Sequence, residues 1–249
     1  MNYLRITWRG LFVLAHLMVA LALSLLLLFN RFDHGSFGGK ITVWWNQRLC
    51  RLFGVRLHIN GQRPDVPVLM VSNHISWFDI PALGSLDFIH FLSKAEVGKW
   101  PLIGWLARKS GTLFIQRGAK GAASKALDDV RQYLSQDESV LIFPEGTTTN
   151  GEDVKRFHSR LLQAAIDTGV AIQPVAISYP HEGRVHPKAP YIDDVTLLES
   201  ILGMLDEKTM NVVIQFLPPI PSQGGDRDSL ANQAEDQIRK QIQMLYQMN

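Results

Sequence analysis

The chain has 249 residues and a formal net charge of +2, and 46% of its residues are hydrophobic. This length suits one sizeable α/β domain with appendages, and no repeat or low-complexity linker divides it. The hydrophobic fraction is high for a fully soluble protein, which favours contact with lipid. A single cysteine excludes an intramolecular disulfide, and we expect Cys50 to be a packed small residue and not a catalytic thiol.

The N-terminal region contains one long uncharged run. Leu11 through Phe29 reads LFVLAHLMVALALSLLLLF, close to the roughly 20 apolar residues with which a helix crosses a bilayer core. A cleavable signal peptide is the competing interpretation, but its apolar region has only roughly 7–15 residues, and no A-x-A cleavage site follows here. We therefore expect a retained membrane segment, in which His16 can face a neighbouring helix.

A second apolar helix is expected from Lys40 to Phe53, after a glycine-rich loop. Its adjacent tryptophans, Trp44 and Trp45, suit the interface between lipid and water. Two arrangements fit these segments: a helical pair embedded in one leaflet, or a spanning first helix with the second on the membrane surface. Residues 1–53 are therefore predicted to form an N-terminal membrane-associated helical segment.

After Gly54 the pattern changes to short apolar runs that alternate with amphipathic segments. The predicted strands are Val55–Ile59, Val68–Val71, Phe88–Leu92, Thr112–Ile115, Val140–Phe143, Ile172–Ser178 and Val212–Leu217. The predicted helices are Trp77–Leu86, Leu102–Arg108, Ala122–Leu134, Ser159–Asp167, Leu197–Leu205 and a last one from Asp228 to Met248 that starts with an Asp-Ser cap signal. This alternation predicts an α/β fold, a mixed sheet flanked by helices, over residues 54–249.

The stretch Val71–Ile80, VSNHISWFDI, places His74 and Asp79 five residues apart directly after a predicted strand. An imidazole that is oriented by a carboxylate can act as a general base that activates a hydroxyl. The carboxyl end of a strand is also where ligands bind in α/β sheets. Ser76-x-x-Asp79 reads in addition as a capping box, and the two roles of Asp79 can coexist.

Three further segments lie in or directly after predicted strands. Gly111–Gly118, GTLFIQRG, presents Arg117 at its end, where a guanidinium can clamp a phosphate or is simply a surface arginine. Phe143–Thr149, FPEGTTT, offers a carboxylate, a glycine and hydroxyls that suit a polar headgroup or a plain turn. Pro174 lies in the apolar run Ala171–Ile177, which indicates a strand at an edge, at a bulge or beside the active cleft.

One segment is strongly basic. Between Lys94 and Lys125 the net charge is +6, because only Glu96 opposes these basic residues: Lys94, Lys99, Arg108, Lys109, Arg117, Lys120 and Lys125. An acidic substrate, an acidic carrier or an anionic lipid surface is the natural partner of such a segment, and a solvated face is the alternative.

From about Val68 to Ile177 the order and spacing of these blocks resemble the glycerolipid acyltransferase superfamily, whose bacterial type member acylates lysophosphatidic acid. His74 and Asp79 match its N-H-x4-D motif, GTLFIQR is similar to its second block, and FPEGT matches its third. The resemblance implies that His74 and Asp79 are catalytic. It also implies that the acceptor is positioned by Arg117, Glu145, Gly146 and Thr147.

The resemblance further implies acyl transfer from acyl-CoA or acyl carrier protein to the free hydroxyl of a lysophospholipid, with 1-acyl-sn-glycerol-3-phosphate as the expected acceptor. Gln116 and Thr148 depart from the pattern of members that form phosphatidic acid, which commonly carry Arg in place of Thr148. The alternative acceptor is another lysolipid, either lyso-ornithine lipid or one with a larger headgroup. An inactive lipid-binding membrane protein is the alternative of a different class.

We expect no cofactor, no metal and no nucleic-acid partner. The chain contains no H-E-x-x-H or G-x-S-x-G motif, which argues against a metal-dependent hydrolase and against a serine nucleophile. The expected location is the inner (cytoplasmic) membrane. The active site of the protein would face the cytoplasm, because acyl thioesters are found there.

Overall fold

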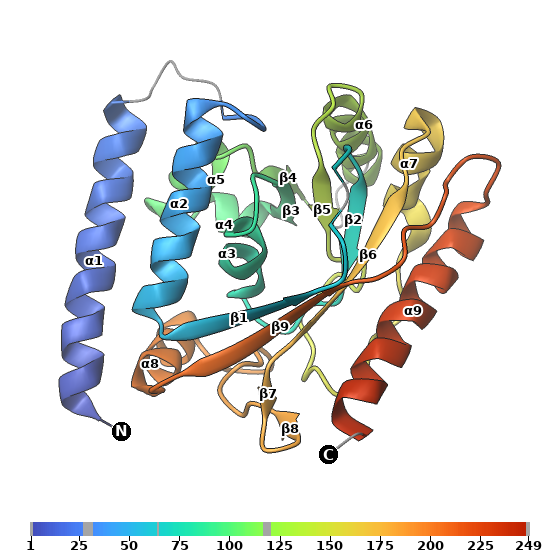
Figure 1. Cartoon of the computed structure of the whole chain (residues 1–249). Helices are drawn as coiled ribbons and strands as arrows, with labels where there is room; N and C mark the ends of the chain where they lie inside the picture. Colours follow the sequence, from blue (N-terminus) through green and yellow to red (C-terminus); the bar gives the residue numbers. More distant parts are fainter. Residues whose placement is uncertain (1, 27–31, 64, 117–120, 248–249) are drawn as a thin grey trace.

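The computed structural model describes residues 2–26, 32–63, 65–116 and 121–247. Within them a mixed sheet has the strand order β1-β9-β6-β2-β5-β3-β4 and is flanked by helices, so the predicted α/β fold is confirmed (Figure 1). The strands are β1 (Val55–Asn60), β2 (Leu69–Ser72), β3 (His90–Lys94), β4 (Leu113–Ile115), β5 (Val140–Ile142), β6 (Ile172–Ser178) and β9 (Met210–Phe216). Each strand predicted from an apolar run is present, although β3 starts at His90 and not at Phe88.

The direction of the strands defines one functional edge. The five strands β6, β2, β5, β3 and β4 run parallel, whereas β9 is antiparallel to β6 and parallel to β1. The segments that follow β2, β5 and β6 therefore leave the sheet at the same edge. This is the edge at which α/β sheets bind ligands.

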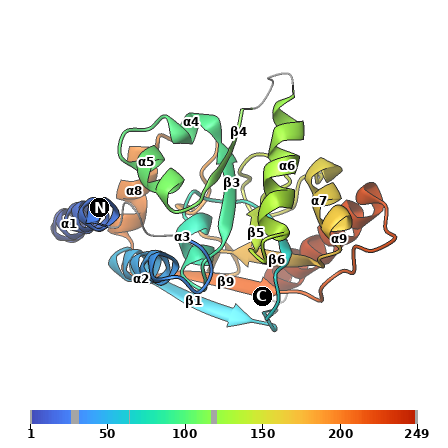
Figure 2. The same cartoon turned by 90° about the horizontal axis from the view of Figure 1, so that it is seen from above.

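Helices cover both faces of the sheet, as Figure 2 shows from above. They are α1 (Tyr3–Leu26), α2 (Phe37–Leu52), α3 (Asp79–Gly84), α4 (Ala95–Gly98), α5 (Ile103–Lys109), α6 (Ala122–Leu134), the 3₁₀ turn η1 (Ser159–Leu162), α7 (Gln163–Thr168), α8 (Leu197–Asp206) and α9 (Arg227–Gln247). A small hairpin consists of β7 (Pro180–His181) and β8 (Arg184–Val185).

The core lies on both sides of the sheet because neighbouring residues of a strand point to opposite faces. In β2, Met70 packs into the cluster that contains residues of α2, α3 and α8. Leu69 and Val71 pack into the other cluster, with residues of α6, α7 and α9. A strand buried on both faces has a continuous apolar sequence, which explains why these strands were visible as unbroken runs.

Pro174 lies in β6, and one part of the expectation about this strand is wrong. β6 is a central strand between β9 and β2, not an edge strand. Its ladder with β9 begins at Val175, so the missing N–H of Pro174 falls outside it, while the Pro174 carbonyl still accepts from the Leu217 N–H (3.0 Å). The proline is tolerated because its position requires only an acceptor.

The C-terminal helix α9 starts one residue before the predicted position. Asp226 accepts hydrogen bonds from the N–H groups of Asp228 (3.1 Å) and Ser229 (3.0 Å). Asp226 is therefore the residue that caps this helix, and the Asp-Ser pair lies inside its first turn. The expected end at Met248 lies outside the described residues.

The two N-terminal helices pack side by side (Figure 1). The His16 ring stacks on Trp45 with a centroid distance of 4.9 Å, and His16 Nε2 lies 3.0 Å from the Trp45 carbonyl oxygen. The expectation that His16 faces a neighbouring helix is therefore confirmed. In the part of the chain that the structure describes, α1 is the one helix long and apolar enough to cross a membrane, and most of it is exposed.

Arg9 fastens α1 to the rest of the protein. The side chain is buried, and Gly54 leaves it room, because a Cβ added at Gly54 would lie 2.7 Å from Arg9 Nη2. Its guanidinium donates to the backbone carbonyl oxygens of Phe53 (3.5 Å), Leu205 (3.3 Å), Glu207 (2.5 Å) and Lys208 (3.1 Å). Phe53 and Glu207 cap the C-terminal ends of α2 and α8, where carbonyl groups lack helical partners and attract a cation.

We expect Arg9→Met to loosen this attachment. Methionine keeps an apolar stem but leaves the carbonyl groups at both helix ends without their donor, at a cost of about 2 kcal/mol in the free energy of unfolding. Urea denaturation in detergent measures this cost. Arg51→Met, which removes an exposed arginine from α2, is the control and should change the free energy by less than about 0.5 kcal/mol. Equal effects of the two substitutions would contradict the role of Arg9.

Candidate active site

The site begins where β2 ends. The side chain of Asn73 accepts from the Ile177 N–H and donates to the Ile177 carbonyl oxygen, both at 2.9 Å. The Asn73 side chain thus replaces the main chain in the hydrogen bonding between β2 and β6. The backbone can therefore turn away from the sheet immediately after Ser72. His74 is thereby placed at the carboxyl edge of the sheet.

His74 and Asp79 form a hydrogen-bonded pair, as the motif predicts. His74 Nδ1 lies 2.7 Å from Asp79 Oδ2, and the same carboxylate oxygen accepts from the N–H groups of Ile75 (2.8 Å) and Ser76 (3.0 Å). Since Oδ2 faces only donors, Nδ1 carries the proton and Nε2 is left as the basic nitrogen. Nε2 bonds to no described residue, and the His74 side chain is 17% exposed.

The other oxygen of Asp79 receives a donor that the sequence did not reveal. The hydroxyl of Tyr179, directly after β6, donates to Asp79 Oδ1 at 2.6 Å. Both side chains are fully buried. Burial, together with the neighbouring Asp79 carboxylate, raises the pKa of Tyr179 well above its usual value, so the phenol stays a donor.

The start of α3 differs from the predicted capping box. The N-cap residue is Phe78, without a side-chain cap, and the Ser76 hydroxyl accepts from the Phe78 N–H (3.3 Å). Asp79 does reach back to the Ser76 N–H, which is one half of a capping box. Asp79 therefore combines a local structural role with its bond to His74, as expected.

Glu145 holds two segments of backbone in place. Its carboxylate accepts from the N–H of His74 (2.8 Å) and from the N–H of Lys155 (2.8 Å). Burial raises the pKa of Glu145 to about 7, although these two hydrogen bonds lower it. The carboxylate thus fixes the backbone at His74 and at the far end of the loop that follows FPEGT.

The residues around Glu145 shape the same loop. The Phe143 ring stacks on the His74 imidazole with a centroid distance of 3.9 Å. Gly146 has a φ of 73°, a left-handed conformation that favours glycine, and its N–H closes a turn onto the Phe143 carbonyl oxygen (3.0 Å). Thr149 then returns to His74, because its N–H donates to the His74 carbonyl oxygen (2.8 Å).

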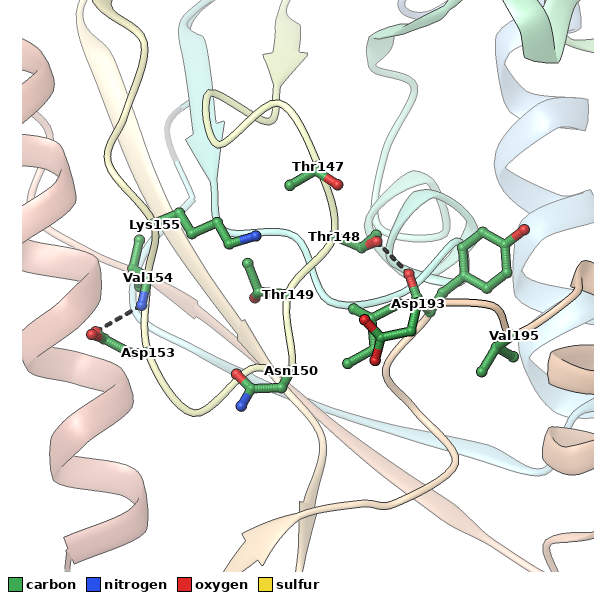
Figure 3. A pocket seen from close by; sticks show the side chains of 11 residues that line it. Thr147, Thr148, Thr149, Asn150, Asp153, Val154, Lys155, Asp193 and Val195 are labelled. Carbon is green, nitrogen blue, oxygen red and sulfur yellow. Dashed lines mark hydrogen bonds between the residues drawn. The ribbon is translucent and has the colours of Figure 1, made fainter.

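A cavity of about 670 Å³ lies beside this loop (Figure 3). One wall runs from Thr147 to Asn150 and the other from Tyr191 to Val195, and Lys155 reaches in from the side of the first wall. The Thr148 hydroxyl donates to the Tyr191 carbonyl oxygen and links the walls. The Tyr191 N–H donates to the Ile75 carbonyl oxygen (2.9 Å), so the cavity borders the backbone next to His74.

The structure unites only part of the predicted set. His74, Asp79 and Glu145 are in direct contact through hydrogen bonds, and Gly146 and Thr147 follow in the same loop. Arg117 lies outside the described residues. Gln116 follows β4, which lies three strands from β2 in the sheet. At roughly 4.8 Å per strand, β4 is therefore about 14 Å from the strand that precedes His74.

Cys50 takes no part in this site. It is buried, and burial raises its pKa to about 12, so the thiol is not a nucleophile at neutral pH. The expectation of a packed small residue is confirmed.

Sequence reasoning missed Tyr179 as a partner of Asp79, and it did not single out Lys155 and Asp193, which line the cavity. For Tyr179 a signal exists, since a tyrosine directly after a buried strand lies at the carboxyl edge once that strand is known to be parallel to β2. Asp193 offers no such signal, because it lies in a loop far along the chain.

The arrangement supports one kind of chemistry best. A partly exposed imidazole with a free Nε2 and a carboxylate on Nδ1 can remove a proton from a hydroxyl and stabilise the resulting imidazolium. In the described residues no group of three or more His, Cys, Asp or Glu side chains could hold a metal ion. The fold and this pair therefore define an α/β protein whose candidate site can activate a hydroxyl group.

Comparison with known proteins identifies the family. A family model described as Acyltransferase matches residues 54–178. A protein of Pseudomonas aeruginosa named lyso-ornithine lipid O-acyltransferase is 48% identical over 200 residues, which cover 80% of this chain and 77% of the relative. A protein of Brucella abortus with the same name is 32% identical and aligned over 94% of both chains.

The fold also has a solved counterpart. The crystal structure of the 1-acyl-sn-glycerophosphate (LPA) acyltransferase PlsC from Thermotoga maritima superposes with a TM-score of 0.63 and 21% sequence identity, over 83% of this chain and 78% of that chain. The chain belongs to the acyltransferase family of the glycerolipid superfamily. It is an O-acyltransferase of lysolipids.

The raised pKa of Glu145 has a measurable consequence for stability. Between about pH 4.5 and 7 the folded protein keeps a proton on Glu145 that the unfolded chain has lost, so the folded state loses stability as the pH rises. The free energy of unfolding of the wild type relative to Glu145→Gln should fall by about 2–4 kcal/mol from about pH 5 to about pH 8 and then level off.

Urea denaturation at a series of pH values, with both proteins in the same detergent, provides this difference. Because glutamine does not titrate, the other ionisable groups cancel to first order. A difference that stays constant across the range would show that Glu145 is ionised throughout.

Proposed function

We propose that the protein transfers a fatty acyl group from a thioester to the free hydroxyl of lyso-ornithine lipid. Thr148 supports this acceptor, because members of the resembled superfamily that form phosphatidic acid commonly have arginine at this position. Here the Thr148 hydroxyl donates to the Tyr191 carbonyl oxygen. The names of the relatives from Pseudomonas aeruginosa and Brucella abortus support the same acceptor. These two observations favour lyso-ornithine lipid, the alternative acceptor of the sequence analysis, over 1-acyl-sn-glycerol-3-phosphate.

In the proposed mechanism His74 is the general base. Its Nε2 takes the proton of the acceptor hydroxyl while the hydroxyl oxygen attacks the thioester carbonyl carbon. A C–O bond forms, the C–S bond breaks, and the leaving thiolate receives the proton from His74. Asp79 holds the ring and stabilises the imidazolium, and Tyr179 positions Asp79.

The remaining predicted residues would position the acceptor. Gly146 and Thr147 present the loop beside the cavity. Glu145 acts through the backbone, since both of its oxygens already accept N–H groups. Arg117 stays a proposed contact from the resemblance alone.

The proposed acyl donor is acyl-CoA or acyl carrier protein. Both are acidic, and the exposed lysines Lys94, Lys99 and Lys125 belong to the basic segment that would attract them. We further propose that residues 1–53 attach the enzyme to the inner membrane, with residues 54–249 as the acyltransferase domain on the cytoplasmic side. The exposed apolar surface of α1 and the lipid acceptors of the relatives support membrane association.

The test of the acceptor is a lysolipid panel. Purified protein in detergent is incubated with radiolabelled acyl-CoA or acyl carrier protein and with lyso-ornithine lipid, lysophosphatidic acid or lysophosphatidylcholine. We expect kcat/KM for lyso-ornithine lipid to exceed the other values by at least about tenfold. A preference for lysophosphatidic acid would instead support 1-acyl-sn-glycerol-3-phosphate as the acceptor. If no combination of donor and lysolipid gave a product, an inactive lipid-binding protein would be favoured.

His74→Ala tests the mechanism. Loss of a general base typically costs about 10²–10⁴-fold, so kcat should fall by at least about 100-fold while the protein stays folded. Initial rates with the preferred acceptor measure the loss, and circular dichroism verifies the fold. His58→Ala, which removes an exposed histidine from β1, is the matched control and should keep its activity. Near-normal transfer by His74→Ala would rule out the general base.

A further inference from the structure

The cavity beside the candidate catalytic pair is lined by two exposed side chains of opposite charge. Lys155 reaches into it from one side, and Asp193 lies on the opposite wall (Figure 3). Neither side chain forms an ion pair or a side-chain hydrogen bond with any residue that the structure describes. A cation and an anion that face one hollow without partners are complementary to a ligand that carries both charges.

The third charged side chain of the cavity, Asp153, and the Thr148 hydroxyl are already engaged. Asp153 pairs with Arg239 (3.0 Å) and accepts from the Val154 N–H (2.7 Å). The Thr148 hydroxyl is bonded to the Tyr191 carbonyl oxygen. Charge recognition in this cavity is therefore left to Lys155 and Asp193.

Both residues are held by backbone contacts that connect them to the catalytic pair. The Lys155 N–H donates to Glu145, which also binds the His74 N–H. Asp193 has a φ of 54°, in the left-handed region that aspartate tolerates better than most side chains. The segment before it is fastened to the backbone of Ile75 by the Tyr191 N–H (2.9 Å). The backbone at both residues is thus positioned relative to His74 before a ligand arrives.

We propose that this cavity binds the zwitterionic amino-acid headgroup of the acceptor, with its carboxylate on Lys155 and its ammonium on Asp193. This inference rests on the proposed function, because ornithine linked through its α-amine keeps one carboxylate and one ammonium. A phosphomonoester carries about −1.5 to −2 charge and no cation, so Asp193 would repel it. The same pair therefore selects the headgroup and disfavours lysophosphatidic acid.

The experiment uses two headgroup analogues of lyso-ornithine lipid: a carboxamide, which lacks the carboxylate, and a δ-N-acetyl derivative, which lacks the ammonium. Asp193→Asn should raise KM for the intact lipid about fivefold and leave KM for the N-acetyl derivative unchanged. Lys155→Met should raise KM for the intact lipid by a similar factor and leave KM for the carboxamide unchanged. In both variants kcat should stay near the wild-type value.

Matched controls are available next to each residue. Asp194→Asn and Arg156→Met remove exposed charges of the same sign that do not line the cavity, and they should alter no KM. If Asp193→Asn or Lys155→Met raised KM equally for the intact lipid and for the analogue that lacks its partner charge, the assignment would be wrong.

A second readout separates this inference from the proposed function. If the wild type acylates no lyso-ornithine lipid, the proposed function fails, and an NMR titration with soluble N-butanoyl-ornithine decides the headgroup site alone. Binding that both cavity variants weaken about fivefold, and both controls preserve, supports the site. Absence of binding to the wild type, or equal binding to all variants, overturns it.

Discussion

The buried carboxylate of Asp79 is the constraint on which the site depends. A fully buried negative charge is costly unless donors surround it, and this one receives the His74 ring, the N–H groups of Ile75 and Ser76 and the Tyr179 hydroxyl. These donors come from the loop after β2 and from the end of β6. The same set of bonds therefore closes the fold at this edge and fixes the tautomer and orientation of the imidazole.

Glu145 performs a parallel task for the main chain. Asp79 orients a side chain, whereas Glu145 accepts the N–H groups of His74 and Lys155 and joins the catalytic segment to the loop that borders the cavity. In the proposed mechanism the chemistry thus depends on two buried carboxyl groups, each of whose oxygens accepts a hydrogen bond. The charges of Lys155 and Asp193, which we propose to contact the acceptor, are exposed. In the proposed mechanism they can change without disturbing the proton transfer. Such a separation would allow one reaction to serve different lipid headgroups.

Local patterns predicted the parts of the fold that depend on burial alone. β2, β5 and β6 are buried on both faces, so each appears in the sequence as an unbroken apolar run. The spacing of His74 and Asp79 likewise lies within one loop and one helical turn, where distance along the chain determines distance in space. The position of Pro174 was predicted less well, because whether a strand is central depends on its neighbours and not on its own residues.

The sequence by itself determined the α/β class, the family and the apolar character of the N-terminal segment, and it pointed to His74 and Asp79 as the candidate pair. These features follow from hydrophobic periodicity and from residues close together in the chain. Only the tertiary structure brought Tyr179 to Asp79, across 100 residues, and Asp193 to the cavity that Lys155 enters. Such contacts depend on the order and direction of the strands. Strand order results from the packing of the whole domain, which no local segment encodes.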